Sequence, residues 1–202
     1  MNNGQRIVIT GIGALSPNGI GRENYFAAIA AGRSGIRTIT QFDASALPAR
    51  IAGEVDFDPE RWVDAKNIRH VSRVVPMAIA ATDEALRDAN LDPLAQTLEQ
   101  RQNIGVMLGS GGGAIEFSER MYELWFAEKE KQASIYSIPS GTIGTIASEI
   151  SMAYDLTDSR TSSRPAAPRP PTPWGTPTAT SSSASATRSS AAAPTRRSPR
   201  RS

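Results

Sequence analysis

The feature that most constrains this chain is an abrupt loss of large apolar side chains after Leu156. From Thr157 to Ser202 there is no Val, Ile, Leu, Met, Phe or Tyr, and Trp174 is the only large apolar residue. Such a segment cannot bury enough apolar surface to offset the conformational entropy lost on ordering. We therefore predict a folded body over 1–156 and a disordered tail, rich in Pro, Ser, Ala and Arg, over 157–202.

The tail is strongly basic, whereas the body is mildly acidic. Eight arginines and the single acid Asp158 give 157–202 a charge of +7, so the total of +2 leaves the body at −5. A mildly acidic body gives no reason to expect a nucleic acid or an anionic membrane as a partner. The basic tail leaves one alternative open, an α/β domain that carries a disordered nucleic-acid-binding arm.

The residue inventory excludes several kinds of site. The sequence has no cysteine, which excludes disulfides, thiolate metal sites and thiol nucleophiles, and His70 is its only histidine. A lone imidazole beside Arg69 and Arg73 makes neither a metal site nor a triad, so we predict a non-catalytic role for it, no metal and no cofactor. No apolar run approaches the roughly 20 residues of a membrane span, and MNNGQR lacks the apolar core of a signal peptide. A cytoplasmic protein without a membrane partner is expected.

Strand-like and helix-like segments alternate along the body. β-Branched and apolar residues predict a buried strand in RIVITGIGALSP (6–17), where Ile7 to Thr10 stand together before breaks at Gly11 and Gly13, and a second buried strand in IGVMLGSGGGA (104–114), which ends in a glycine-rich turn. The segment ARIAGEV (49–55) resembles a short strand. Helical spacing predicts helices over 23–31, 76–91, 114–131 and 140–156. This alternation predicts an α/β fold with a largely buried sheet.

Two of these helices have faces that can be assigned. Five alanines between residues 78 and 89 predict that the 76–91 helix lies close against a sheet, with its solvent side formed by Asp83, Glu84, Arg87 and Asp88. The 114–131 helix is expected to bury one stripe formed by Phe117, Met121, Leu124 and Trp125.

The run GSGGGA (109–114) follows a strand-like segment, where a nucleotide loop would also stand. No Lys-Ser/Thr pair follows it, and its spacing does not match GxGxxG in a convincing place. A structural turn with close backbone approach is therefore favoured over a nucleotide site.

Several motifs then occur in a familiar order. These are RIVITGIGALSPNGIGRENYFAAIAAGRSGI (6–36), FD (42–43), EALRDANL (84–91), IGVMLGSGGG (104–113) and IPSGTIGTIASEISMAYDL (138–156). In sequence and order they resemble the N-terminal half of the β-ketoacyl-acyl carrier protein synthases, the condensing enzymes of fatty-acid and type II polyketide synthesis. The resemblance implies an incomplete thiolase-like fold with α-β-α-β-α layers.

The resemblance also implies a function. Members condense an enzyme-bound acyl thioester with malonyl-acyl carrier protein by decarboxylative Claisen condensation, so the expected partners are acyl carrier protein, malonyl and acyl thioesters, and a second copy in a homodimer. The segments 104–116 and 133–156 resemble those that build the dimer interface. By similarity, Gly111, Gly112 and Gly113 lie near the acyl channel, and Gly112 stands where some fatty-acid members carry a bulky gating residue. A glycine there leaves room for longer or branched chains.

The same resemblance places the chemistry outside the body. The family's nucleophilic cysteine is expected after Leu156, and its two catalytic histidines come later still, but this sequence has none of the three. No catalytic residue is assigned, and the chain is predicted to be inactive. Loss of the strand expected after Leu156 would expose a sheet edge and apolar helix faces.

The departure from the family begins where the composition changes, which suggests a reading-frame change near residues 155–160. In an offset frame, SRPAAP (163–168) can encode Ser-Thr-Gly-Cys-Thr and AAAPTRRSPR (191–200) can encode GGGADAPIAP, both similar to family motifs. The hypothesis is that 157–202 is out of frame. A genuine disordered tail, or a truncated scaffold that binds acyl carrier protein or dimerises without catalysing, are the alternatives.

Overall fold

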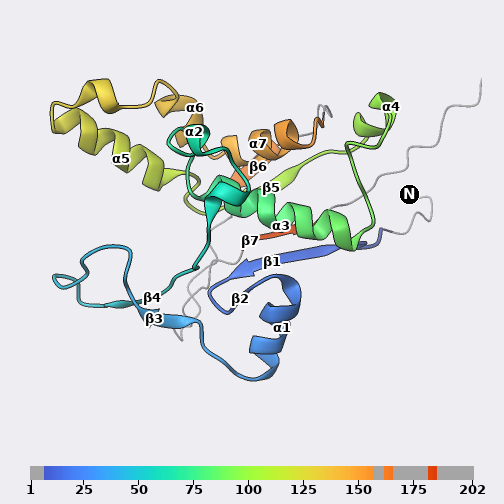
Figure 1. Ribbon diagram of the computed structural model, residues 1–202, viewed down its shortest axis with the longest axis horizontal. Coiled ribbons are helices and arrows are strands. Elements are labelled where there is room, and N and C mark those ends of the chain that lie inside the picture. The colour runs from blue at the N-terminus through green and yellow to red at the C-terminus, as the bar shows by residue number, and fades with distance from the viewer. Residues whose placement is uncertain (1–6, 157–161, 166–181, 186–202) are drawn as a thin grey trace, which may run out of the picture.

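The computed structural model describes residues 7–156, 162–165 and 182–185 (Figure 1). Its helices are α1 (Arg22–Ala30), α2 (Ala65–Ile68), α3 (Val74–Asp88), α4 (Leu98–Arg101), α5 (Ile115–Phe126), α6 (Ser137–Gly141) and α7 (Thr145–Ala153), with two short 3-10 turns at Pro59–Arg61 and Glu130–Gln132. Its strands are β1 (Ile12–Ser16), β2 (Gly19–Ile20), β3 (Ile36–Thr38), β4 (Ile51–Gly53), β5 (Met107–Ser110), β6 (Ser162–Pro165) and β7 (Ser182–Ser185). The α/β class is confirmed.

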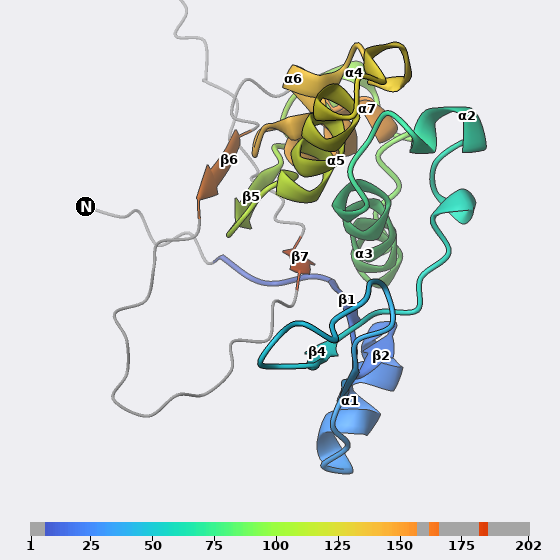
Figure 2. The same ribbon diagram turned by 90° about the vertical axis from the view of Figure 1, so that its left-hand side faces the viewer.

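Helix α3 organises the molecule. Both views show it between an upper group formed by α5, α6 and α7 and a lower group formed by β1, β2 and α1 (Figures 1 and 2). On one side, Val75 and Ile79 of α3 pack with Ile146 and Ile150 of α7 in one buried cluster. On another side, Ala81 packs against Leu15 of β1. The predicted packing of this helix against a strand is therefore present. The helix starts at Val74, and Pro76 lies in its first turn.

The strands form three small sheets. One has the order β2-β1-β7, with both pairings antiparallel, a second joins β3 to β4 antiparallel, and a third joins β5 to β6 in parallel. Strands β6 and β7 lie within the predicted tail, so those eight residues differ from the expected disorder. They do so because each strand supplies backbone hydrogen bonds to an open edge, of β5 and of β1 respectively. The remainder of 157–202 lies outside the described residues.

The expectation of a largely buried sheet holds only in part. Leu15 and Ser16 of β1 are buried, whereas the residues before β1 and half of β5 are exposed. Strand β1 begins only at Ile12, and Ile7 and Ile9 before it are 85% and 72% exposed. In β5, Met107 is 71% exposed. The physical reason is pairing: within the described residues, β1 and β5 belong to separate small sheets, and the β1 pairings begin at Ile12. The apolar run of 7–10 is therefore left on the surface.

Gly11 and Gly13 have a different role from the one expected. They do not end the strand; Gly13 lies inside β1. A Cβ at Gly13 would lie 1.9 Å from the carbonyl oxygen of Ala81, and one at Gly11 would lie 2.1 Å from that of Ala85. The two glycines let the strand backbone touch the alanine face of α3.

The remaining helices match the expectations in part. Helix α1 ends before Gly32, whose φ of +64° suits a helix C-terminal stop. In α5, Phe117 and Met121 are buried as predicted, but Trp125 is 61% exposed because α5 buries only a narrow stripe. No helix among the described residues is long and apolar enough to cross a membrane.

The predicted helix over 140–156 is divided into α6 and α7. Thr142 adopts an extended backbone between them, and its hydroxyl donates to the Pro139 carbonyl and lies 3.0 Å from the Thr145 hydroxyl. Gly141 and Gly144 flank this break. Glycine and threonine both weaken helix interiors, so local side-chain bonding prevails here over helix continuation.

Candidate functional site

The glycine-rich turn joins β5 to α5. The Ser110 hydroxyl accepts a hydrogen bond from the Gly113 amide at 2.8 Å, which closes the turn. Gly113 has a φ of +60°, and a Cβ there would lie 2.8 Å from Cγ1 of Ile143. Backbone conformation and space therefore both require glycine at 113.

Gly111 and Gly112 are under no such constraint. A Cβ at Gly111 would meet no atom within 4 Å, and one at Gly112 would make an ordinary contact, 3.6 Å from Cγ2 of Ile115. The turn can thus accept side chains at these two positions without a backbone change. A position at which a larger side chain would narrow an acyl channel requires such space.

The turn lies against the α6–α7 connection. Besides the Gly113–Ile143 contact, a Cβ at Gly141 would lie 2.5 Å from the Ser118 hydroxyl of α5. These close approaches bring together the turn predicted to line an acyl channel and the 133–156 segment predicted to form an interface. The two predictions therefore fall on one region of the molecule.

This region exposes large apolar side chains. Within the predicted interface segments 104–116 and 133–156, the exposed large apolar residues are Met107, Ile115, Ile135, Tyr136, Ile138 and Met152. Ile135 and Ile138 are 86% and 82% exposed. Helix α5 adds Tyr122, Trp125 and Phe126. We call the nine residues, which include Met107 of β5 and Met152 of α7, the α5–α6 apolar surface; large apolar side chains exposed in such number are typical of proteins that bind a partner.

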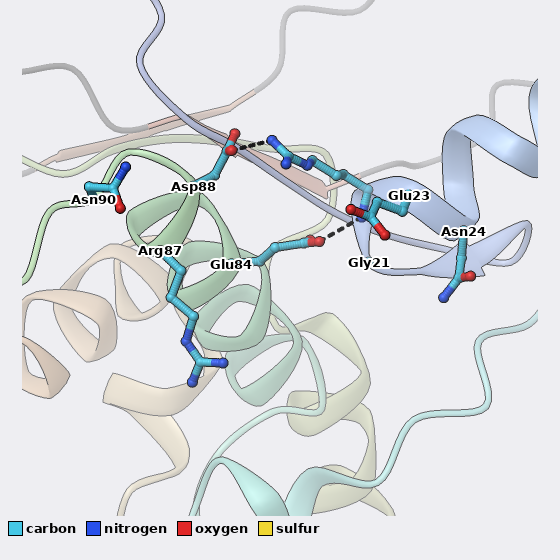
Figure 3. Close-up of a pocket in the computed structure, with 8 residues that line it drawn as sticks. Gly21, Glu23, Asn24, Glu84, Arg87, Asp88 and Asn90 are labelled. Atoms are coloured by element: carbon cyan, nitrogen blue, oxygen red, sulfur yellow. Dashed lines mark hydrogen bonds and ion pairs between the residues drawn. The ribbon is translucent and has the colours of Figure 1, made fainter.

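A second candidate lies where the C-terminal half of α3 meets the start of α1, at an open pocket of about 550 Å³ (Figure 3). Glu84 accepts from the amides of Ala14 and Arg22 at 2.8 and 2.7 Å. Asp88 accepts from the amide of Ile12 at 3.0 Å and pairs with the Arg22 guanidinium. The Ile12 amide, followed by Arg22, holds the pKa of Asp88 below its usual range.

These contacts correct one prediction. Glu84 and Asp88 were expected on the solvent side of the helix, but they satisfy backbone N–H groups of β1 and of the start of α1. The reason is that β1 crosses α3 at Gly11 and Gly13, which places its free amides over the i, i+4 carboxylates. Because their oxygens already accept protein hydrogen bonds, we assign these carboxylates a structural role.

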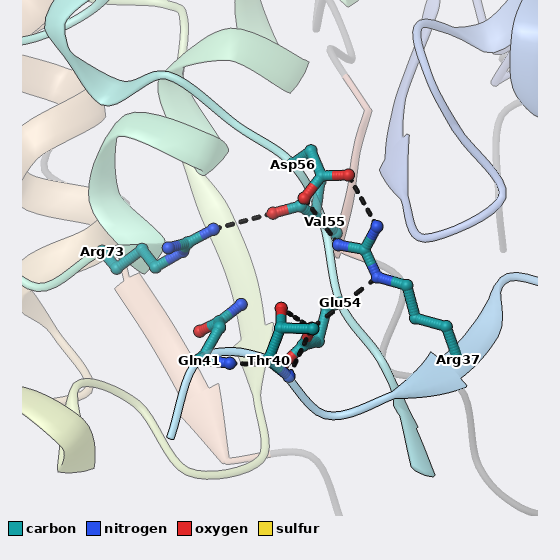
Figure 4. Close-up of polar contacts among 7 residues, drawn as sticks. All are labelled: Arg37, Thr40, Gln41, Glu54, Val55, Asp56 and Arg73. Atoms are coloured by element: carbon teal, nitrogen blue, oxygen red, sulfur yellow. Dashed lines mark hydrogen bonds and ion pairs between the residues drawn. The ribbon is translucent and has the colours of Figure 1, made fainter. Parts of the chain in front are cut away.

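A third group of polar contacts stabilises the β3–β4 hairpin (Figure 4). The buried Glu54 accepts from the amides of Thr40 and Gln41 and from the Thr40 hydroxyl at 2.7 Å. The Thr40 hydroxyl is the largest cause of a lowered Glu54 pKa. Arg37 donates two hydrogen bonds to Asp56, at 2.7 and 2.5 Å, which lower the pKa of Asp56 and raise that of Arg37.

The Glu54 cluster predicts a pH-dependent stability. A carboxyl whose folded pKa lies below its unfolded value stabilises the fold above the unfolded pKa, about 4, and loses that contribution as pH falls through the folded pKa. Glu54→Gln should therefore destabilise the protein near pH 7, and the difference from wild type should shrink as the pH falls below about 4. Urea denaturation at both pH values measures it. A difference that does not change with pH would show that packing, and not the charge, is responsible.

No group of three or more His, Asp or Glu residues that could hold a metal occurs among the described residues. His70 has the side chains of Ser134 and Arg69 as hydrogen-bond partners. The predicted absence of catalytic, metal and cofactor residues stays a prediction.

Comparison with known proteins bears on these features. The family described as "Beta-ketoacyl synthase, N-terminal domain" matches residues 4–161. The chain is 37% identical over 153 residues to the 3-oxoacyl-[acyl-carrier-protein] synthase 2 of Coxiella burnetii, covering 75% of this chain and 36% of the relative. It is also 37% identical over 133 residues to the tetracenomycin polyketide synthase ketoacyl synthase beta subunit of Streptomyces glaucescens, covering 65% and 32%.

Solved structures of ketosynthases are also similar to this chain. The ishigamide ketosynthase/chain length factor superposes with a TM-score of 0.65 at 27% identity, over 79% of this chain and 39% of that one. A β-ketoacyl synthase from Burkholderia phymatum superposes with a TM-score of 0.57 at 25% identity, over 80% and 38%. The chain thus spans between 32% and 39% of the length of these four proteins.

Proposed function

This chain belongs to the β-ketoacyl synthase family, and we propose that its body contributes the acyl-pocket turn and the dimer face of a condensing enzyme while supplying none of the reacting groups. The reaction would be decarboxylative condensation of an acyl thioester with malonyl-acyl carrier protein. Relatives named for both fatty-acid and polyketide synthesis support that class of reaction.

The absence of the reacting groups follows from the residue types that the sequence contains. Thioester exchange with a protein requires a nucleophile that is also a good leaving group, which a cysteine thiolate provides. These 202 residues contain no cysteine, and their single histidine has Ser134 and Arg69 as side-chain partners. The family match ends at residue 161, next to the point of the proposed frame change, which supports the view that the reacting groups were encoded in another register.

The glycine turn carries the proposal. Gly113 is fixed by its φ and by Ile143, whereas Gly112 has room for a side chain near Ile115. A residue at 112 could thus change the space beside the turn while the backbone stays in place. We expect glycine here to leave the acyl channel open to longer or branched chains.

The α5–α6 apolar surface supports a homodimer. Six of its residues fall in the two segments that resemble the family's dimer interface, and Ile135 and Ile138 are almost fully exposed in the single chain. Burying an isoleucine side chain in an interface is worth about 1.5 to 3 kcal/mol. A second copy would cover this surface next to the glycine turn.

A chimera tests the proposal. Residues 6–156 replace the corresponding segment of a full-length 3-oxoacyl-[acyl-carrier-protein] synthase 2, and condensation is followed with acyl groups of increasing length. We expect an active dimer, and we expect Gly112→Ile to reduce use of the longest chains at least about fivefold while short chains react as before, because an added side chain that fills a pocket costs about 1 to 3 kcal/mol.

The controls separate the parts of the proposal. Arg61→Gln in the chimera should leave chain-length selectivity unchanged, because Arg61 is an exposed residue that pairs with Asp58 and lies outside the glycine turn. The unmodified 202-residue chain should take up no acyl group from an acyl thioester. Acylation of that chain would overturn the assignment of a scaffold, and unchanged selectivity in Gly112→Ile would overturn the assignment of the pocket.

A further inference from the structure

His70 connects two segments that are far apart in the sequence. It lies between α2 and α3, and its Nδ1 is 2.9 Å from the hydroxyl of Ser134. Its backbone carbonyl accepts from the Ser140 hydroxyl at 2.6 Å, and its ring meets Tyr136 edge-to-face with centroids 5.3 Å apart. Both serines are buried. One residue therefore holds the 134–140 segment at both of its ends.

The contacts fix the protonation state of the ring. The Nε–H of Arg69 donates to Nε2 of His70 at 3.0 Å, and a guanidinium has no acceptor. Nε2 must therefore carry no proton, so Nδ1 carries it and donates to the Ser134 hydroxyl oxygen, which also accepts from the Tyr136 amide at 3.1 Å. The arrangement as it stands requires a neutral imidazole.

Four charged side chains are held on the elements around the ring. Arg69 faces it directly, and Arg120 of α5 donates to the Arg69 carbonyl at 3.4 Å. Arg73 on the other flank donates to the Val55 carbonyl, and Glu116 of α5 accepts from Ser72. The 134–140 segment carries no charged side chain, and Tyr136 is its only titratable one. Among the described residues His70 has no ion pair with a carboxylate.

We propose that His70 is a protonation-sensitive latch that holds the 134–140 segment when neutral and releases it when charged. A protonated Nε2 would point an N–H at the N–H of Arg69, and two cations would lie 3.0 Å apart. Turning the ring away removes this conflict, but it also withdraws Nδ1 from Ser134 and the ring from Tyr136. The released segment carries Ile135, Tyr136 and Ile138 of the α5–α6 apolar surface. This latch does not depend on the proposed enzymatic function.

Amide hydrogen exchange on the full 202-residue chain tests the latch. The Ser137 and Ser140 amides donate to the carbonyls of Ser134 and Tyr136, so their protection reports on the segment. Between about pH 7.5 and about pH 5.5, the range in which imidazoles titrate, exchange corrected for intrinsic rates should become about fivefold faster. Amides of α3 should keep their protection. His70 is the only histidine, so its imidazole NMR signals follow the protonation step alone.

Two variants and a control test whether the pH response depends on His70 and Arg69. Arg69→Gln removes the opposing cation and should reduce the pH response to less than about twofold. Arg61→Gln removes an exposed arginine that pairs with Asp58, and it should respond as wild type does. His70→Asn should show rapid exchange with no pH response. If the imidazole titrates while Ser137 and Ser140 stay equally protected, Arg69 alone moves aside and the latch is refuted; a pH response that survives in His70→Asn refutes it too.

Discussion

Gly13→Ala is expected to cost about 3 kcal/mol or more of the free energy of unfolding, a large share of the roughly 5 to 15 kcal/mol that is typical of a folded domain. The added Cβ would stand 1.9 Å from the carbonyl oxygen of Ala81 and 2.9 Å from its carbonyl carbon. These are backbone atoms inside α3, so no rotamer change can relieve the overlap. Strand β1 would have to move off the helix, breaking the bonds from Ala14 to Glu84 and from Ile12 to Asp88.

Urea denaturation followed by circular dichroism measures this effect, and Gly111→Ala is the matched control. That substitution makes the same chemical change where nothing lies within 4 Å, so the urea midpoint should stay within experimental error of wild type. A Gly13→Ala variant as stable as Gly111→Ala would mean that β1 does not lie on α3 as described here.

The sequence predicts helices of this protein better than its strands. Ala81 and Ala85 repeat at helical spacing on one face of α3, so a local pattern reveals both the helix and its close packing. Strand pairing is not local. The run at 7–10 has the composition of a buried strand, yet Ile7 and Ile9 are 85% and 72% exposed, because the strand pairings begin only at Ile12. Apolar composition alone could not show this.

The candidate sites, too, could be predicted from the sequence only in part. The glycine turn is visible as a run of letters, but the sequence does not distinguish Gly113, which must be glycine, from Gly112, which need not be. Glu84 and Asp88 stand four residues apart on one face, a signal that they act together. Their partners, the amides of Ile12 and Ala14, come from a segment 70 or more residues earlier. Only the crossing of β1 over α3 brings them within reach.

The nucleotide sequence of the gene can decide the origin of the 157–202 tail. The large aliphatic residues end at Leu156, and the family match ends at residue 161. A single inserted or deleted base near codons 155–160 accounts for both observations, and it also accounts for the absence of cysteine. The frame-change hypothesis stays a prediction, and the nucleotide sequence over codons 150–202 tests it directly.

Phe117→Ala should cost about 3 to 5 kcal/mol, the usual range for a large aromatic side chain removed from a core. Phe117 is fully buried, and it packs with Ala114 and Met121 in a cluster flanked by Leu124 and Ala133. The Arg120 guanidinium also lies 5.1 Å from its ring centre. Truncation leaves a cavity under α5, at the point where this helix meets the segment that follows it.

Phe126→Ala is the matched control on the same helix. Phe126 is 81% exposed, so its truncation should change the free energy of unfolding by less than about 0.5 kcal/mol. The two variants separate the two roles of α5, since Phe117 should govern folding and Phe126 should govern only what the α5–α6 apolar surface contacts. Thermal unfolding gives the first quantity and sedimentation velocity gives the second. If Phe126→Ala destabilises the monomer as much as Phe117→Ala does, α5 buries the opposite face from the one described.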